Sequence, residues 1–207
     1  MPLFRCLWRG RGAVLLALFL AVWAPLSSLA RSRQGEAVEV CVLVPRVEAL
    51  DEGEAVGELP TATPVLLVVE PLRQVRIETA NGRLLWNRLA PAGAALDRPL
   101  PWPLPPLEPE QEVVLRLQPL GAADDAYAHV RLRAAPAARL TATAVLIAQL
   151  GRSGDAWLAA LRTALAAGDV PLAWTLLYAP QAPATEALLD LRRELLRRGC
   201  GDGDAAG

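Results

Sequence analysis

Hydrophobic and polar residues follow two different rhythms along the chain. In residues 36–136, short apolar runs alternate with clusters of Pro, Gly, Asn and Asp, which is typical of β-strands joined by turns. In residues 139–199, Ala and Leu recur at helical spacing instead. We therefore expect an α+β protein, in which an antiparallel β-sandwich, immunoglobulin-like in outline, is followed by a small all-helical module. Residues 200–207 are a Gly-rich tail, which we expect to be flexible.

The first expected strands differ in how much of their surface should be buried. Alternating Val residues from Val38 to Val44 predict a strand with one buried face and a second, half-buried face. Five acidic residues between Glu48 and Glu58 predict a solvated loop. The uninterrupted apolar run from Pro64 to Glu70 predicts a central strand that is buried on both faces.

The strongest local pattern predicts a β-hairpin. Apolar and polar residues alternate before Asn81-Gly82, which offers the two positive-φ positions of a type I′ turn. The Pro-rich residues 91–109 predict a connection or an edge cover, because Pro has no N–H for a ladder hydrogen bond. Two more strands are expected near residues 112–118 and 127–133. In the last strand we expect three inward side chains, with a bulge after the first: Tyr127, Val130 and Leu132.

Four helices are expected in the second part, separated by recognisable start and stop signals. Their ranges are about 141–150, 155–167, 170–177 and 185–198. Trp157 of the second helix and Trp174 of the third lie on faces that can meet, so we expect an antiparallel helical hairpin packed through the two rings. The first helix has apolar residues on all sides, which predicts that it is the wedge between this hairpin and the β part.

Residues 1–30 have the three parts of a secretory signal peptide in the usual order. Basic residues up to Arg11 precede an apolar stretch from Ala13 to Ala24, and the segment ends in Ser28-Leu29-Ala30. Cleavage after Ala30 would place the protein in the periplasm or outside the cell. An uncleaved signal that anchors the chain to the membrane is the alternative. After signal removal, no stable membrane span is expected, because an apolar run long enough to cross a bilayer is not found elsewhere in the sequence.

Charge argues against nucleic acid as a partner. All 21 basic residues are Arg. Without residues 1–30 the sequence has 18 Arg and 22 acidic residues, a net charge of −4. Proteins that bind nucleic acid generally present a basic face to the phosphates. We therefore expect no nucleic-acid partner.

Export also changes the interpretation of the cysteines. Cys41 and Cys200 remain as an even pair in a compartment that permits disulfides, so they are candidates for one bridge. The alternative is that Cys41 is a small core residue and Cys200 a free thiol in the tail. The sequence leaves both interpretations open.

Side chains that carry chemistry are few. The chain has one His, four Ser and three Cys, and it lacks metal-ligand spacing, a Gly-rich phosphate loop and a nucleophile elbow. We therefore expect no cofactor, no metal and no enzymatic activity. His129 is the one candidate general base, and a hydrolase that uses it is the weakest of three functional hypotheses.

The remaining candidates are surfaces formed by aromatic side chains. Trp86 and Trp102 at one end of the sandwich could bind a small ligand or a carbohydrate, although Trp102 could equally cover the core as a lid. Trp157 and Trp174 belong to a helical hairpin that could present a groove. The four Arg between Arg192 and Arg198 are expected to pair with acids of their own helix. The leading hypothesis is an exported, non-enzymatic interaction protein of the cell envelope, whose partner the sequence does not identify.

A set of four short motifs occurs in order along residues 38–178. They are Leu43-Val44-Pro45, Asn81-Gly82-Arg83-Leu84-Leu85-Trp86, Leu104-Pro105-Pro106-Leu107-Glu108 and Ala156-Trp157-Leu158-Ala159-Ala160-Leu161. In these motifs the chain resembles an exported, uncharacterised family that is common in cyanobacteria. It departs from that family at Val113-Val114-Leu115, where members tend to carry Tyr-x-Trp. The resemblance implies a sandwich-like β domain joined to a short helical tail, and it implies no catalytic residues.

Overall fold

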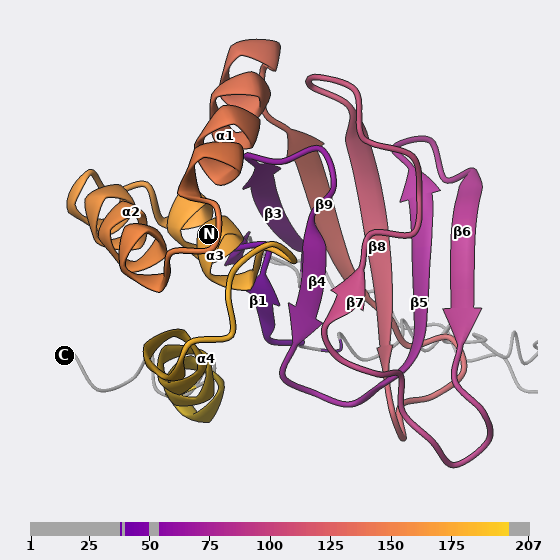
Figure 1. Ribbon diagram of the computed structural model, residues 1–207. Coiled ribbons are helices and arrows are strands. Elements are labelled where there is room, and N and C mark those ends of the chain that lie inside the picture. Colours follow the sequence, from indigo (N-terminus) through magenta and orange to yellow (C-terminus); the bar gives the residue numbers. More distant parts are fainter. Residues whose placement is uncertain (1–37, 39, 50–53, 199–207) are drawn as a thin grey trace, which may run out of the picture. The chain divides into compact units, whose positions relative to one another are not determined.

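The computed structural model describes residues 38, 40–49 and 54–198. The described residues form a mixed α+β structure with two sheets and four helices (Figure 1). The strands are β1 Val42–Val44, β2 Glu48–Ala49, β3 Glu54–Leu59, β4 Val65–Val68, β5 Leu72–Thr79, β6 Leu84–Leu89, β7 Leu100–Pro101, β8 Glu112–Pro119 and β9 Ala128–Ala134. The helices are α1 Ala137–Leu150, α2 Gly154–Ala166, α3 Val170–Tyr178 and α4 Glu186–Arg198.

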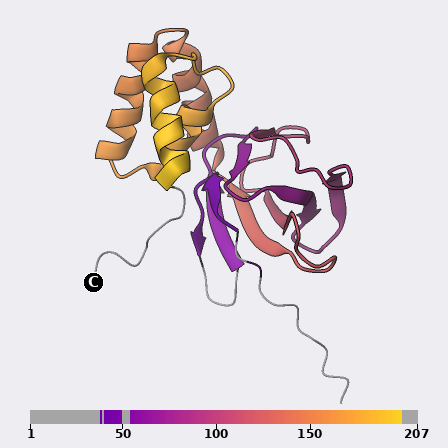
Figure 2. The ribbon, with the colours of Figure 1, turned by 90° about the horizontal axis from the view of Figure 1, so that it is seen from below.

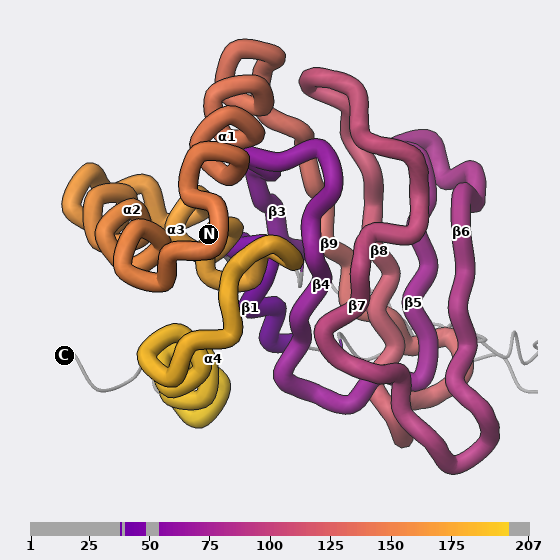
Figure 3. The backbone as a smooth tube through the Cα atoms, in the orientation of Figure 1, coloured from indigo at the N-terminus to yellow at the C-terminus, as the bar shows by residue number. Residues whose placement is uncertain are grey.

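The two sheets differ in size and in the direction of their strands. The smaller sheet has the order β1-β4-β7 and is antiparallel. The larger sheet has the order β2-β3-β9-β8-β5-β6, and all of its pairs are antiparallel except β3 with β9, which is parallel. The expectation of a purely antiparallel structure is therefore wrong at this one pair. The chain passes from one sheet to the other five times: between β1 and β2, β3 and β4, β4 and β5, β6 and β7, and β7 and β8 (Figure 3).

The smaller sheet lies between the larger sheet and the helices, so it is covered on both faces. Val42 of β1 and Leu66 of β4 belong to the core shared with the larger sheet. Their sequence neighbours Leu43 and Leu67 belong to a second core, shared with the helices. Successive strand residues point to opposite faces, so each strand contributes to two cores. This confirms the prediction that the run from Pro64 to Glu70 is a central strand buried on both faces.

The sequence predicted a solvated loop between Glu48 and Glu58, and this prediction is wrong for part of the stretch. Its described residues include β2 and β3, and β3 pairs with β9 along six residues. Pairing with β9 satisfies the backbone of β3, while the Glu54 and Glu58 side chains remain exposed. The exposed acids therefore do not prevent the segment from completing a sheet. Tertiary pairing outweighs their low strand propensity.

The predicted hairpin is β5 with β6, but its turn is of a different type. The N–H of Gly82 donates to the carbonyl of Thr79 (2.9 Å), and the N–H of Thr79 donates to the carbonyl of Arg83 (2.9 Å). Gly82 has a φ of +82°, whereas the φ of Asn81 is not positive. A type I′ turn would need a positive φ at both residues. The loop is instead a turn followed by a left-handed Gly, the arrangement of three-residue hairpin loops.

The inward residues of β9 also differ from the expectation. Ala128, Val130 and Leu132 alternate regularly into the core, and β8 pairs with β9 without a bulge. Tyr127 precedes the strand, and its hydroxyl donates to Gln74 at 2.6 Å. The predictions for Val130 and Leu132 are therefore confirmed, whereas the prediction for Tyr127 is wrong. The small Ala128 takes the inward position, and the regular period of two is kept.

The helices begin and end within one residue of the predicted bounds, except that α1 begins at Ala137, four residues before the predicted start at 141. The hydroxyl of Ser153 accepts from the N–H of Ala156 before α2, and the carboxylate of Asp169 accepts from the N–H of Leu172 before α3. Gly168 follows the end of α2 and has a φ of +73°, the left-handed conformation in which many helices end. The four helices lie beside one another on one side of the sheets (Figure 2).

Docking of the helices on the β part is confirmed, but the expected wedge is wrong. Helix α3 lies against β1 and buries Leu176 and Leu177. In α1 the one buried residue is Thr143, and Val145 is 48% exposed. Many Ala and Thr side chains give α1 little apolar surface to bury, whereas α3 supplies large apolar side chains. Helix α1 therefore lies at the margin of the second core.

Several sequence predictions fall outside the described residues. They concern the signal peptide at residues 1–30, the tail at residues 200–207 and Cys200 as the partner of Cys41. Cys41 itself is buried in the second core. Among the described residues, none of the helices has both the length and the apolar character that a bilayer crossing requires.

Candidate functional site

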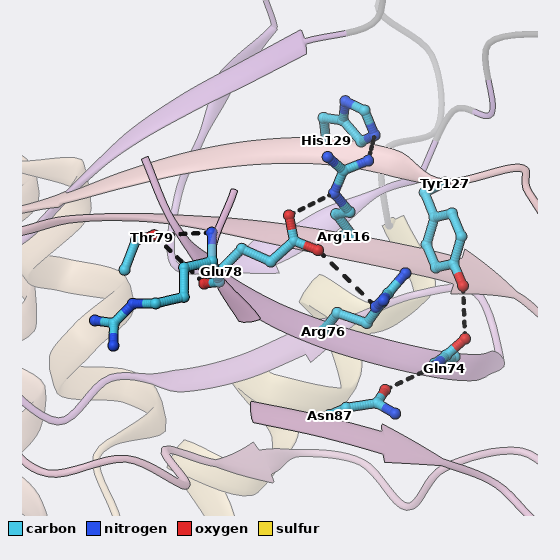
Figure 4. A network of polar contacts seen from close by, with 9 residues as sticks. Gln74, Arg76, Glu78, Thr79, Asn87, Arg116, Tyr127 and His129 are labelled. Carbon is cyan, nitrogen blue, oxygen red and sulfur yellow. Dashed lines mark hydrogen bonds and ion pairs between the residues drawn. The ribbon is translucent and has the colours of Figure 1, made fainter. Parts of the chain in front are cut away.

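The outer face of the larger sheet carries a network of polar side chains (Figure 4). Residues that alternate with the core residues of β5, β8 and β9 point to this face. Five of them form the centre of the network: Gln74, Arg76, Glu78, Arg116 and His129. Because they come from neighbouring strands in register, the sheet itself fixes their spacing.

Glu78 lies at the centre of the network and is only 6% exposed. Its carboxylate accepts from Nε of Arg116 at 2.8 Å and lies 3.9 Å from Nε of Arg76. The two Arg face each other directly across β5 and β8. Like charges in such a position repel, so the carboxylate between them holds the pair together.

Arg76 is held by packing more than by hydrogen bonds. Its guanidinium carbon lies 5.8 Å from the centre of the Tyr127 ring. Its Nε is buried without a hydrogen-bond partner among the described residues. The Tyr127 hydroxyl donates to Gln74, whose amide donates to Asn87 on β6 at 2.7 Å. This chain of contacts extends the network to the edge of the sheet.

His129 is linked to the network by Arg116. Nη1 of Arg116 donates to Nε2 of His129 at 3.2 Å, so the ring accepts in its neutral form. Burial, followed by the Arg116 charge, lowers the pKa of His129 below its usual value of 6.5, while Glu54 and Glu78 oppose this shift. A general base must also lie within reach of a nucleophile or a substrate proton. The hydrogen-bonded neighbour of His129 is a guanidinium, and this geometry does not favour a hydrolase.

A groove adjoins this face where β3 and β9 approach the turn before α3. Its volume is about 630 Å³. Arg131 and Arg133 of β9 line it, and they pair with Glu54 at 3.7 Å and with Glu110 at 3.0 Å. Further charged side chains of both signs line the groove: Arg46, Glu48, Glu58 and Glu112. The rest of the lining comes from β3 and from residues around the start of α3.

The sequence pattern alone does not predict this groove. The signal that was available is the alternation of His129, Arg131 and Arg133 with apolar residues in one strand, which places three basic side chains on one face. This alternation does not indicate which strand pairs with β9. Residues of β3 reach the groove only through the parallel pairing with β9.

Trp86 and Trp102 lie over the core at one end of the sandwich. Both are partly buried against that core, and Nε1 of Trp102 donates to the carbonyl of Pro105 at 3.1 Å. They line a cavity of about 10 Å³, which is room for about one water molecule. The cavity is too small for a sugar. The position of Trp102 fits the interpretation as a lid on the core.

Trp157 and Trp174 do not lie together on a surface. Trp157 is 1% exposed, and its Nε1 donates to the carbonyl of Gly151 at 3.0 Å. Trp174 is partly buried and stacks on Tyr178, with 6.1 Å between the ring centres, instead of packing ring to ring with Trp157. Both residues therefore stabilise the second core.

The part of the chain that the structure describes holds no group of His, Cys, Asp and Glu side chains placed to bind a metal ion. Comparison with family models, with curated proteins and with solved structures finds no match for this chain. The outer face of the larger sheet and the adjoining groove are the candidate functional surface of the described residues.

Proposed function

We propose that this chain is an exported, non-enzymatic interaction protein of the cell envelope, and that it binds a protein partner through the outer face of its larger sheet. The observation that supports the proposal is the line of charged side chains across β5, β8 and β9, which leads into the groove of about 630 Å³. These side chains are positioned by the sheet before any partner arrives. Binding to such a surface costs little side-chain entropy.

The chemistry of the face is that of recognition. Arg provides several hydrogen-bond donors in a fixed plane, and exposed Glu residues lie beside the Arg residues of the groove. A face with both signs of charge selects a partner by complementary charge and rejects others by repulsion. No step of this proposal requires a nucleophile or a metal.

The test compares two charge-matched double variants. In Arg131→Ser/Arg133→Ser the groove loses two cations, whereas in Arg88→Ser/Arg152→Ser two exposed cations outside the groove are lost. Each protein is used as bait with envelope extracts, and captured proteins are quantified by mass spectrometry. We expect one partner to be retained by the parent and the control, and to fall about tenfold or more with the groove variant. Equal capture by all three baits, or no enriched protein, would contradict the proposal.

Location in the envelope is a separate part of the proposal. It rests on the pattern of residues 1–30, whose small residues Ser28 and Ala30 fit the positions before a cleavage site. N-terminal sequencing of the protein from its producing cells is expected to begin at Arg31. A chain that begins at Met1 and sediments with membranes would support the anchored alternative instead.

We further infer that the β part is an immunoglobulin-like sandwich. The two sheets share a core, and the chain passes repeatedly from one sheet to the other. The first strands of the described chain also divide between the sheets, with β1 in the smaller sheet and β3 in the larger one. The resemblance to the exported cyanobacterial family remains an expectation of the same kind. An experimental structure in which β3 did not pair with β9 would contradict the inferred topology.

A further inference from the structure

A second cleft lies between the smaller sheet and helix α4. Its volume is about 420 Å³, within the range of small-molecule sites. Apolar residues form most of its wall. They come from β4, from the segment before β7, from the connection between α3 and α4, and from α4 itself: Leu67, Pro99, Ala179, Ala182 and Leu196. Two guanidinium groups, those of Arg98 and Arg192, border the same cleft.

Arg192 departs from the pattern of its helix. The other basic residues near the end of α4 pair with acids of the same helix: Arg193 with Asp190, and Arg197 and Arg198 with Glu194. Arg192 turns toward α3 instead, where its Nε donates to the carbonyl of Leu177 at 2.8 Å. Its guanidinium carbon lies 5.6 Å from the centre of the Tyr178 ring. Burial lowers the pKa of Arg192, which indicates a cation that has lost part of its hydration.

Arg98 approaches the cleft from the segment before β7. Its Nη1 donates to the carbonyls of Val68 and Val69, the first at 3.1 Å. In the described ranges, the ion pairs involve neither Arg98 nor Arg192. These hydrogen bonds leave Nε and Nη2 of Arg98, and both terminal nitrogens of Arg192, as further donors.

We propose that this cleft binds a small organic anion that carries one carboxylate on an apolar body. The two guanidinium groups supply charge-assisted hydrogen bonds to the carboxylate, and the apolar wall takes the body of the ligand. Arg192 is a half-buried cation with no acidic partner among the described residues, which is costly, so an arriving carboxylate gains more beside it than beside an exposed Arg. Arg98 is exposed and supplies further donors at the same cleft. The site is separate from the outer sheet face, and it stands whether or not that face binds a protein.

A purely structural role for both Arg is the competing explanation. Arg192 would then serve the C-terminal end of α3, and Arg98 would serve the end of β4, through their bonds to main-chain carbonyls. Such a role predicts a loss of stability on substitution and no affinity for carboxylates. The two explanations therefore differ in binding, which a titration measures directly.

The experiment is a calorimetric titration of the purified protein with decanoate, decanol and acetate. We expect decanoate to bind, and decanol and acetate to bind about tenfold or more weakly, because each lacks one half of the recognised chemistry. Arg98→Gln should weaken decanoate binding about tenfold or more. Arg193→Gln, on the outer side of the same helix, should leave it unchanged.

Folding is controlled by the choice of variants. Arg98 is exposed, so its substitution should preserve the fold. Arg192 can be tested in the same way with Arg192→Gln. If that variant is unstable, Arg192→Lys keeps the charge. Decanol that binds as tightly as decanoate would overturn the proposal. So would a folded Arg98→Gln variant with the affinity of the parent, or the absence of decanoate binding at millimolar concentration.

Discussion

At the scale of single residues, Glu78 shows how one buried carboxylate organises a surface. The side chain is 6% exposed and lies between two Arg that face each other across neighbouring strands. Substituting it by Gln keeps the shape and removes the charge that holds these cations. The cost to folding should be moderate, because both guanidinium groups remain partly in contact with water.

We predict that Glu78→Gln lowers the free energy of unfolding by about 1–2 kcal/mol, measured by urea denaturation. Glu112→Gln is the matched control, because this exposed Glu lies 4.0 Å from Arg133 and should contribute less than about 0.5 kcal/mol. Equal effects of the two substitutions would mean that the position of Glu78 between the Arg pair does not matter.

His129 makes stability depend on pH in a defined direction. Its pKa in the folded protein lies below 6.5, so below that pH the unfolded chain binds more protons than the folded one. The contribution of His129 is therefore complete above about pH 6.5 and is lost as the pH falls through the folded pKa.

We predict that His129→Gln changes the free energy of unfolding by less than about 0.5 kcal/mol at pH 7.5. Between pH 7.5 and pH 5, the variant should lose less stability than the parent, as urea denaturation at both pH values would measure. A parent that loses no more than the variant would mean that Arg116 and burial do not disfavour protonation of the ring.

At the scale of elements, sequence patterns predict those helices and strands that are determined by residues close to one another in the chain. The helices, their caps at Ser153 and Asp169, and the buried strand β4 follow from period and from local hydrogen bonds. Strand β3 could not be predicted, because its partner β9 lies about 75 residues away and the pairing is parallel. The groove depends on that pairing, so it too is absent from any local pattern.

Gly57 is the position in β3 where close approach leaves no room for a side chain. A Cβ there would lie 2.8 Å from the carbonyl oxygen of Arg46 and 3.0 Å from a methyl carbon of Val47. The contact with Arg46 is to backbone, which cannot move aside as a side-chain tip does. The segment before β2 therefore lies against β3 only because this residue is Gly.

We predict that Gly57→Ala destabilises the protein by about 1–3 kcal/mol, the usual cost of overpacking, as a shift of the urea midpoint would show. Glu58→Ala in the same strand should cost less than about 1 kcal/mol, because it removes an exposed pair with Arg139. A neutral Gly57→Ala would show that the segment carrying Arg46 does not lie against β3 in solution.

At the scale of the whole described unit, β1 and β4 join two cores. Leu66 packs toward the larger sheet, and its neighbour Leu67 packs toward the helices. The second core thus combines residues of the helices with residues of these two strands. Isolated helices of this length are marginal in water, so the helices depend on the sheet for their stability.

We therefore predict a single cooperative unfolding transition for the protein in calorimetry, with residues of both cores reporting the same event. Trp157→Ala should lower the free energy of unfolding by about 3–5 kcal/mol, and Leu67→Ala by about 2–5 kcal/mol, because both side chains are buried in the second core. Leu115→Ala in the first core should shift the same transition rather than a separate one. Two transitions, with Trp157→Ala moving only the weaker, would mean that the helices unfold independently, and the walls of the cleft beside α4 would then lack a common support.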